Sequence, residues 1–305
     1  MKRVVSVSLG SSDRDKSVQV QLGGEDFTVE RIGTDGDMQK FADLIRQLDG
    51  NVNAIGFGGG DVYVFSGKRR YAFRETYALA SLAKKTPVVD GSSLKNTLER
   101  EMIQILSREG VIDFPKSKVL LVCGIDRFGM ADALAKSGCK LLFGDLMFAM
   151  GIPLPIWSAA MHRLLAFLLM PVVVRLPFKM LYPTGEKQRK ITPKYGRYFR
   201  WADTIAGDFL LIRKHLPDDL SGKTIITNTT TEQDVALLKE RGLKLLVTST
   251  PVFEGRSFGT NVMEGVVISL LGKPPAQLTP DDYFAKVKEL GWKPELRWLQ
   301  EAPAQ

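Results

Sequence analysis

The chain has 305 residues, 44% of them hydrophobic, so it can bury a substantial core, and its length favours two domains. Two cysteines, Cys123 and Cys139, are too few for a disulfide framework, and the distant histidines His162 and His215 predict no metal site. The formal net charge of +8 favours an anionic partner without selecting one. The N-terminal stretch MKRVVSVSLG has no hydrophobic segment long enough for a signal peptide, so we expect a cytoplasmic protein.

The first third of the chain alternates between strand-like and helix-like patterns. Apolar periodicity predicts strands over 3–9, 27–32, 53–61 and 86–90 and helices over 37–48, 72–84 and 94–109. The following segment GVIDFPKSK, 110–118, has the composition of a domain boundary. We therefore expect an N-terminal α/β domain over residues 1–112.

The rest of the chain predicts a second α/β domain over 113–272, with a C-terminal appendage over 273–305. Its expected strands begin near 118, 140, 203, 223 and 244, and helices are expected over 232–242 and from about 260. Between the second and third strands lies an apolar helical insertion, 146–200. Strands that alternate with helices predict a parallel sheet with its ligand at the carboxyl ends of the strands.

A glycine-bearing turn, CGIDRFG, follows the strand at 118–123. Gly124 and Gly129 are spaced like a dinucleotide-binding turn, but Asp126 stands where that turn has its second glycine. Arg127 could bind phosphate, and the start of the next helix offers free amides. The expected cofactor residues in this turn are Gly124, Asp126, Arg127, Phe128, Gly129 and Met130. An adenosyl ligand and a ligand-free structural turn are the alternatives.

Further cofactor contacts are expected at the ends of the other strands. Asp145, some twenty residues beyond the turn, is placed to hold a ribose hydroxyl, or else to cap the insertion. The nicotinamide would lie near Asp208, Asn228, Thr229, Thr230 and Thr248. The expected cofactor is NAD or NADP.

Polar residues also follow the strands of the first domain. Ser8, Ser11 and Ser12 form a loop able to hold a carboxylate or polyol. Gly59 and Gly60 permit close approach of a ligand to the backbone just before the acid Asp61. Lys95 could act as a general acid or base with Asp90 orienting it. A solvated surface is the alternative. The expected substrate-binding residues are Ser8, Ser11, Ser12, Gly59, Gly60, Asp61, Asn96, Thr260 and Asn261.

The insertion combines an apolar helix, expected over 157–169, with a basic run interleaved with aromatic residues. Prolines and Arg163 argue against a membrane span. The pattern predicts either peripheral membrane contact through 151–200, at the inner membrane face, or a lid or homodimer interface. No nucleic-acid-binding module surrounds the basic run. Its basic residues are Arg175, Lys179, Lys187, Arg189, Lys190, Lys194, Arg197 and Arg200.

The combined pattern resembles the shikimate and quinate dehydrogenase superfamily, in particular bacterial proteins named quinate 5-dehydrogenase. That resemblance implies a substrate domain before a Rossmann domain, a serine loop at Ser8, Ser11 and Ser12, and a polar pair at Asp90 and Lys95. It also implies a cofactor turn at 124–130 and a helix that returns to the substrate domain from 258–261.

The expected function is therefore an NAD(P)-dependent oxidoreductase acting on a hydroxyl or carbonyl substrate in an interdomain cleft. A Rossmann-like transferase that uses an adenosyl donor is one alternative. The other is a membrane-associated lipid- or ligand-binding protein on a dehydrogenase scaffold.

Overall fold

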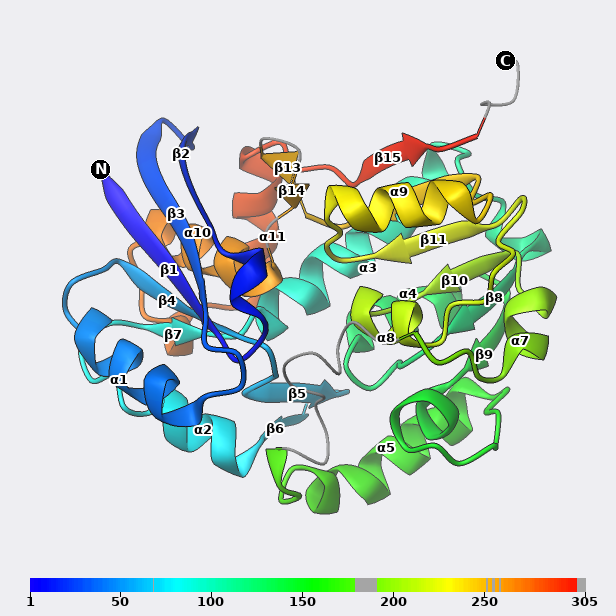
Figure 1. Cartoon of the computed structure of the whole chain (residues 1–305), viewed down its shortest axis with the longest axis horizontal. Helices are drawn as coiled ribbons and strands as arrows, with labels where there is room; N and C mark the ends of the chain where they lie inside the picture. The colour runs from blue at the N-terminus through cyan, green and yellow to red at the C-terminus, as the bar shows by residue number, and fades with distance from the viewer. Residues whose placement is uncertain (68, 179–190, 251, 254–255, 258, 301–305) are drawn as a thin grey trace. The chain divides into compact units, whose positions relative to one another are not determined.

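The computed structural model describes residues 1–305 except 68, 179–190, 251, 254–255, 258 and 301–305 (Figure 1). Several expected features lie outside the described residues. They are the end of the appendage, residue Phe258 at the start of the returning helix, and part of the basic run, namely Lys179, Lys187, Arg189 and Lys190.

The chain forms two compact α/β units, each assembled from three segments. Unit 1 comprises Met1–Thr97, Leu169–Gln188 and Gly259–Trp292, and unit 2 comprises Leu98–Leu168, Arg189–Phe258 and Lys293–Gln305. The α/β class is therefore confirmed. The expected ranges, 1–112, 113–272 and 273–305, are contiguous, whereas the chain passes repeatedly from one unit to the other.

Unit 1 is built on a five-stranded sheet in the order β2-β3-β1-β4-β7. β1 is parallel to β3 and β4, β4 is parallel to β7, and β2 is antiparallel to β3. The strands of this sheet are β1 (Lys2–Ser8), β2 (Lys16–Leu22), β3 (Glu25–Gly33), β4 (Ala54–Gly58) and β7 (Val88–Val89). A separate hairpin consists of β5 (Tyr63–Ser66) and β6 (Arg69–Ala72).

Two helices, α1 and α10, pack against this sheet through buried apolar side chains. On α1, the side chains of Phe41 and Ile45 are fully buried, and Asp37 caps the helix by accepting bonds from two backbone amides. α10 packs against β4, β1 and β7. The helices of unit 1 are α1 (Met38–Leu48), α2 (Arg74–Ala80), α10 (Thr260–Leu271) and α11 (Pro280–Glu289).

Unit 2 is built on a six-stranded sheet in the order β15-β12-β11-β10-β8-β9. Five of its strands are parallel, and β15 pairs antiparallel with β12 at one edge. The strands are β8 (Lys118–Leu121), β9 (Lys140–Phe143), β10 (Thr204–Ala206), β11 (Thr224–Thr227), β12 (Leu245–Thr248) and β15 (Glu295–Trp298). A short ladder joins β13 (Val252–Phe253) and β14 (Arg256–Ser257).

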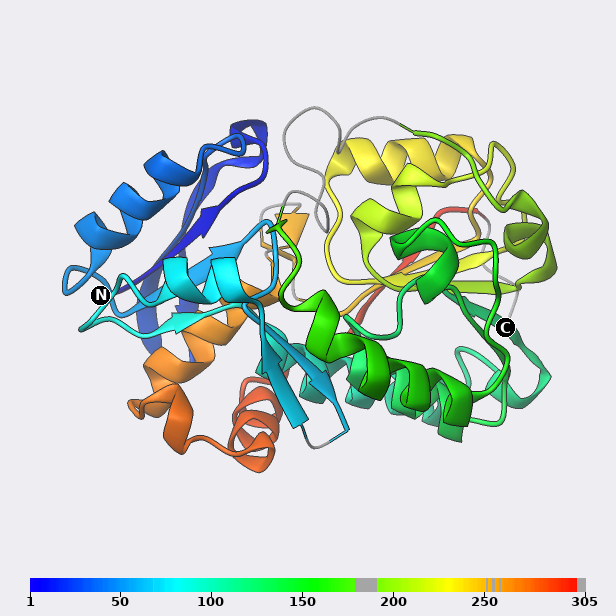
Figure 2. The same ribbon diagram turned by 90° about the horizontal axis from the view of Figure 1, so that it is seen from below.

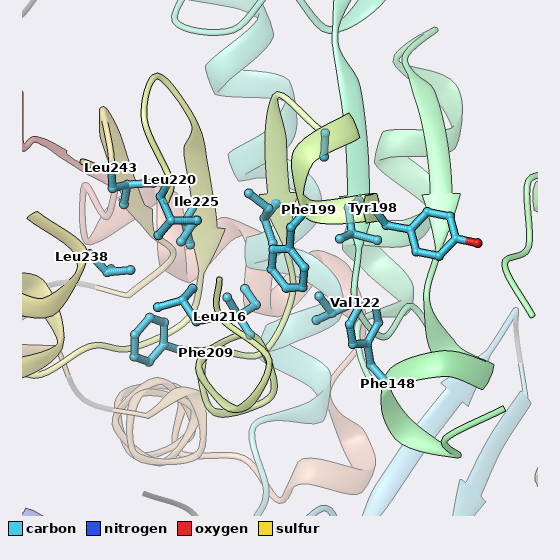
Figure 3. Close-up of a cluster of buried hydrophobic side chains, with 14 of the residues drawn as sticks. Val122, Phe148, Tyr198, Phe199, Phe209, Leu216, Leu220, Ile225, Leu238 and Leu243 are labelled. Atoms are coloured by element: carbon cyan, nitrogen blue, oxygen red, sulfur yellow. The ribbon is translucent and has the colours of Figure 1, made fainter. Parts of the chain in front are cut away.

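Helices alternate with these parallel strands, and side chains from both fill the core of the unit. Figure 3 shows part of this core, in which Val122, Phe199, Phe209 and Ile225 are almost completely buried. The helices are α4 (Phe128–Lys136), α7 (Gly196–Trp201), α8 (Phe209–Lys214), α9 (Glu232–Glu240) and a π-helix at Asp145–Ala149. α3 (Ser92–Arg108) and α5 (Ala159–Val173) each contribute residues to both units.

Most of the expected strands and helices are confirmed, with shifted ends. The elements that were not predicted include β2, the β5–β6 hairpin, α7, α8, the β13–β14 ladder, α11 and β15. The apolar helix of the insertion runs over Ala159–Val173 and keeps Pro171 in its last turn, where the prediction ended it at Leu169. Among the described residues, no helix combines the length and the hydrophobicity that a bilayer span requires.

Candidate functional site

The strand order identifies one position in each unit where a ligand would be expected. We number the parallel strands of unit 2 by their order in the chain. Across the sheet they then follow one another as second, first, third, fourth and fifth, so the order reverses between β8 and β10. The parallel strands of unit 1 lie as second, first, third, fourth, and reverse between β1 and β4. In open parallel sheets, ligands bind outside the carboxyl ends of the strands at this switch point.

At the switch point of unit 2 lies a buried arginine surrounded by carboxylates. Arg127, the residue before α4, is 1% exposed, and it pairs with the fully buried Glu99 through Nη1. Its Nη2 lies 3.1 Å from Asp208 Oδ2, and its Nε lies 3.6 Å from Asp126 Oδ2. The guanidinium holds one wholly buried acid and two that reach solvent, since the Asp126 and Asp208 side chains are 25% and 27% exposed.

Asp208 extends this cluster to the next strand. Its Oδ1 accepts bonds from the amides of Leu210 and Leu211 at the start of α8, while its Oδ2 accepts one from Asn228 Nδ2 at 3.2 Å. Thr250 Oγ1 in turn donates to the Asn228 carbonyl at 3.0 Å. Residues that follow β8, β10, β11 and β12 therefore form one continuous polar edge. Thr230 and Thr248, also expected here, are buried at this edge.

The turn after β8 holds a carboxylate of its own. Asp145 Oδ1 accepts bonds from the backbone amides of Gly124 at 2.9 Å and Ile125 at 2.8 Å. Asp145 Oδ2 lies 3.2 Å from His162 Nε2, and both residues are 3% exposed. Burial would raise the pKa of the Asp145 carboxyl, but the contact with His162 and the two amide bonds outweigh it and hold the pKa below its ordinary value.

Asp145 was expected to hold a ribose hydroxyl, and the structure places its carboxylate on the turn instead. Two of the amides that would meet a phosphate are bonded within the protein. A side chain on Gly124 would also collide with His162 Nε2, at 2.9 Å from its Cβ. Gly129 and Met130 are buried in the first turn of α4, and Phe128 begins that helix.

In unit 1, Lys95 pairs with Asp61, and the Asp90 carboxylate is bonded to backbone amides. Lys95 Nζ donates to Asp61 Oδ1 at 2.6 Å, and the two side chains are 12% and 10% exposed. Asp90 Oδ2 accepts bonds from the amides of Val62 and Tyr63, and its Oδ1 accepts one from Ser92. Asp90 therefore orders the backbone around Asp61 and the start of α3.

The serine loop and the glycine turn of unit 1 are closely packed against each other. Ser8 Oγ accepts bonds from the Gly10 amide and from Arg31, and the Ser11 side chain bonds to Asp13. The Ser12 amide donates to Asp35. Gly59 has φ +81°, and a Cβ there would lie 2.7 Å from the Leu9 nitrogen. At Gly60 a Cβ would meet the Phe178 ring at 2.4 Å.

The start of α10 meets the same edge of the unit 1 sheet. Asn261 Nδ2 donates to Ser6 Oγ at 2.7 Å, and a Cβ on Gly91 would lie 2.6 Å from both the Asn261 nitrogen and Thr260 Oγ1. Asn96, expected to contact substrate, has its Oδ1 buried without a hydrogen bond. The first-domain residues predicted from sequence therefore do lie near one another, held mostly by bonds to the protein itself.

Sequence reasoning missed two buried acids. Glu99 pairs with Arg127, and Glu264 on α10 is 2% exposed beside Tyr283, whose hydroxyl lies 3.2 Å from it. Burial and the nearby charge of Asp90 raise the pKa of Glu264 to about 8. A single acid inside the apolar run NVMEGVVISLL was the available signal. Among the described residues, no group of three His, Cys, Asp or Glu side chains is arranged to hold a metal ion.

The fold and these two sites define a doubly wound α/β protein with two units of related strand order. The chain belongs to the family described as Domain of unknown function (DUF8754), whose model matches residues 93–299. A second model, Domain of unknown function (DUF8753), matches residues 3–90. No curated protein sequence matches the chain.

Solved structures similar to the chain include three proteins described as binding sugars or 5-methylthioribose. They are a glucose-galactose binding protein from Geobacillus stearothermophilus (8% identity, TM-score 0.37, covering 99% of both chains), an arabinose ABC transporter binding protein from Shewanella sp. ANA-3 (10%, 0.36, 89% of this chain and 87% of that one), and a 5-methylthioribose transporter binding protein from Thermotoga lettingae TMO (10%, 0.36, 98% and 86%).

These comparisons correct the identity expected from sequence. The families whose models match the chain are described as domains of unknown function and not as shikimate or quinate dehydrogenases. The expected NAD(P)-dependent oxidoreductase is therefore wrong, and neither a Rossmann-like transferase nor a membrane-associated lipid- or ligand-binding protein on a dehydrogenase scaffold is supported in its place. The prediction failed because the glycine spacing at 124–129 indicates only a tight strand-to-helix turn, which many doubly wound folds share. Binding of NAD or NADP itself stays a prediction.

Proposed function

We propose that unit 2 binds a small, uncharged, hydroxyl-bearing molecule at the carboxyl ends of β8, β10 and β11. A Rossmann-like character of unit 2, in the sense of a ligand held above the switch point of a parallel sheet, is part of this proposal. Three features of the switch point support it: its position in the strand order, the polarity of its partly exposed groups, and the carboxylate that already occupies its turn.

The observation that carries the proposal is the pair of bonds from the Gly124 and Ile125 amides to Asp145. Amides at this turn are the usual donors to a phosphate, and here they bind a buried carboxylate. A phosphate at this turn would have to displace Asp145 or face its charge. The anionic ligand that the glycine spacing suggests is therefore disfavoured at this turn.

The partly exposed groups that remain are hydrogen-bond acceptors. Asp126 and Asp208 present carboxylate oxygens, and the fully buried Arg127 between them balances part of their charge. Carboxylates next to an amide such as Asn228 accept bonds from hydroxyl groups. Bonds of this kind to a charged group contribute about 1.5–3 kcal/mol each. A neutral polyol or monosaccharide is the ligand class that fits this set.

Calorimetric titration with a panel of monosaccharides, polyols, NAD and NADP tests the proposal. We expect a neutral hydroxylated compound to bind, and Asp208→Asn to weaken that binding by about 10- to 100-fold through loss of a charged acceptor. Asn remains a good helix cap, so α8 should persist. Asp218→Asn, at a side chain 96% exposed, is the matched control and should bind like the wild type.

The proposal fails if no hydroxylated compound in the panel binds, or if Asp208→Asn binds it as tightly as the wild type. Binding of NAD or NADP alone would overturn it and establish the dinucleotide prediction instead. The expected homodimer and cytoplasmic location stay predictions, and neither is needed for this site.

A further inference from the structure

Unit 2 exposes an unusual concentration of large apolar side chains between 150 and 168. We define the apolar patch as Ile152, Leu154, Trp157, Met161, Leu164 and Leu168, whose exposed fractions lie between 45% and 57%. Single exposed apolar side chains are common on proteins, but a contiguous run of this kind marks a surface that another partner covers.

Half of this patch lies on α5, the green helix in Figure 2. His162 and Ala166, four residues apart, are buried along one face of the helix. Met161, Leu164 and Leu168 occupy the opposite face, where a surface helix ordinarily carries polar residues. The helix is apolar on both faces within unit 2, so its outer face is not accounted for by packing inside that unit.

The sequence that contains the patch and the segment after it is strongly basic. Between residues 146 and 202 the sequence contains one acidic residue, Glu186, against nine lysines and arginines. Three of the basic residues are exposed in the segment around α7, namely Lys194, Arg197 and Arg200.

Two contacts join this basic segment to the apolar patch. The Trp157 ring meets the Trp201 ring edge to face with centroids 5.1 Å apart, and Tyr195 Oη donates to the Gly151 carbonyl at 3.1 Å. Apolar side chains, an exposed tryptophan and a group of cations therefore lie on neighbouring segments of the same unit.

We propose that the apolar patch and the basic residues beside it bind the surface of an anionic lipid bilayer. The apolar side chains would enter the boundary between headgroups and acyl chains, Trp157 would lie at headgroup depth, and the cations would meet lipid phosphates. No helix spans the bilayer in this arrangement. A second copy of the chain is a poorer occupant, because pairing two patches would bring two groups of cations together without counter-charge. The proposal is independent of the ligand site.

Flotation of the whole protein with vesicles tests this interaction. We expect it to float with vesicles of equal parts phosphatidylcholine and phosphatidylglycerol and not with phosphatidylcholine alone. Binding should weaken as salt rises from about 0.1 to about 1 M, which shortens the Debye length from about 10 to about 3 Å.

Two double variants separate the apolar and the electrostatic contributions. Leu164→Gln with Leu168→Gln removes exposed apolar area without changing charge, and should lower the lipid partition coefficient at least about tenfold. Lys194→Glu with Arg200→Glu should lower it by about 30-fold or more, since each basic residue near an anionic surface contributes about fivefold. Lys84→Glu with Lys85→Glu, at exposed positions of unit 1, makes the same change in net charge and should leave binding within about threefold of wild type.

Circular dichroism and thermal unfolding establish that each variant is folded. The proposal is overturned if the folded wild-type protein does not float, if it floats equally with neutral vesicles, or if both charge variants lose binding alike. It is also overturned if the protein ignores vesicles and Leu164→Gln with Leu168→Gln converts a dimer to monomers in light scattering. That result would assign the apolar patch to a second copy.

Discussion

The two switch points are filled by different groups, although the parallel strands around them have related orders. In unit 1 the loops after β1 and β4 meet backbone to backbone, with Gly59 against the Leu9 amide. In unit 2 the corresponding position is filled by side chains, with Arg127 held between Glu99 and Asp208. The same topology thus leaves polar side chains available in one unit and mainly bonded backbone in the other, so strand order alone assigns no ligand.

The buried acids of the two units are also held in opposite states. On α10 of unit 1, burial and the charge of Asp90 raise the pKa of Glu264 to about 8. In unit 2, Asp145 has its pKa held below the ordinary value despite burial, because two amides and His162 surround its oxygens. Both carboxyls are buried and hydrogen-bonded, and they differ in their neighbours: Asp90 raises the pKa of Glu264, whereas His162 lowers the pKa of Asp145.

Removing the charge at the centre of unit 2 should have the largest effect on stability. Arg127→Met leaves Glu99 buried without its cation, and we expect the free energy of unfolding to fall by about 3–5 kcal/mol in denaturant titrations. Adding Glu99→Gln should restore part of that loss. Lys95→Met in unit 1 should cost only about 1–3 kcal/mol, because its pair with Asp61 keeps some contact with solvent. Equal losses in the two units would refute the contrast.

A pH series separates the two buried acids. The folded-state pKa of Glu264, about 8, exceeds the unfolded value of about 4.3, so folding binds a proton that unfolding releases. Its contribution is therefore complete below about pH 4 and is lost as pH rises towards 8. We expect the free energy of unfolding to drop by about 3 kcal/mol between about pH 5 and 8, and Glu264→Gln to flatten that decline.

Asp145 should show the reverse dependence. Its folded-state pKa is depressed, so its contribution is present above the unfolded value of about 3.9 and is lost as pH falls through the folded value. Asp145→Asn should therefore reduce the loss of stability at acid pH and leave the decline between about pH 5 and 8 unchanged. A Glu264→Gln profile identical to wild type over that interval would contradict the assignment to unit 1.

The glycine contact in unit 1 should have a smaller effect on stability than the loss of Arg127. Gly59→Ala adds a Cβ at φ +81° and 2.7 Å from backbone, and we expect a loss of about 2–3 kcal/mol. Gly24→Ala shares a positive φ, +76°, but has no atom within 4 Å, so it should cost only the backbone term of about 1–2 kcal/mol. Equal melting temperatures for the two variants would show that the loops of unit 1 can separate freely.

The sequence predicted the strands and helices where one periodicity persisted for several residues. The buried run at β1 and the capped helix α1 are examples, since apolar spacing and Asp37 both mark them. It failed at β15, whose four residues ELRW carry no such pattern and gain their place from pairing with β12. α11 was overlooked although Thr279, Pro280 and Asp282 form a capping box with proline at its start.

For the sites, sequence located the strand ends but not the partners across them. Arg127, Asp208 and Asn228 follow different strands and were placed together because parallel strands share a carboxyl edge. The pairing of Lys95 with Asp61 could not be predicted, because both Asp61 and Asp90 follow strands and only the backbone decides which amides each meets. Nor does spacing reveal that Asp145 turns back onto Gly124.

The three-segment composition of each unit has a consequence for biosynthesis. α10 packs on β1, β4 and β7, but it is synthesised about 170 residues after β7. At a translation rate of about 5–20 residues per second, roughly 10–30 s pass between the synthesis of the unit 1 strands and the synthesis of the helix that packs on them. β15 adds its edge to the other sheet later still. An emerging chain therefore carries uncovered apolar strands for most of its translation, and it should depend on holding chaperones during that interval.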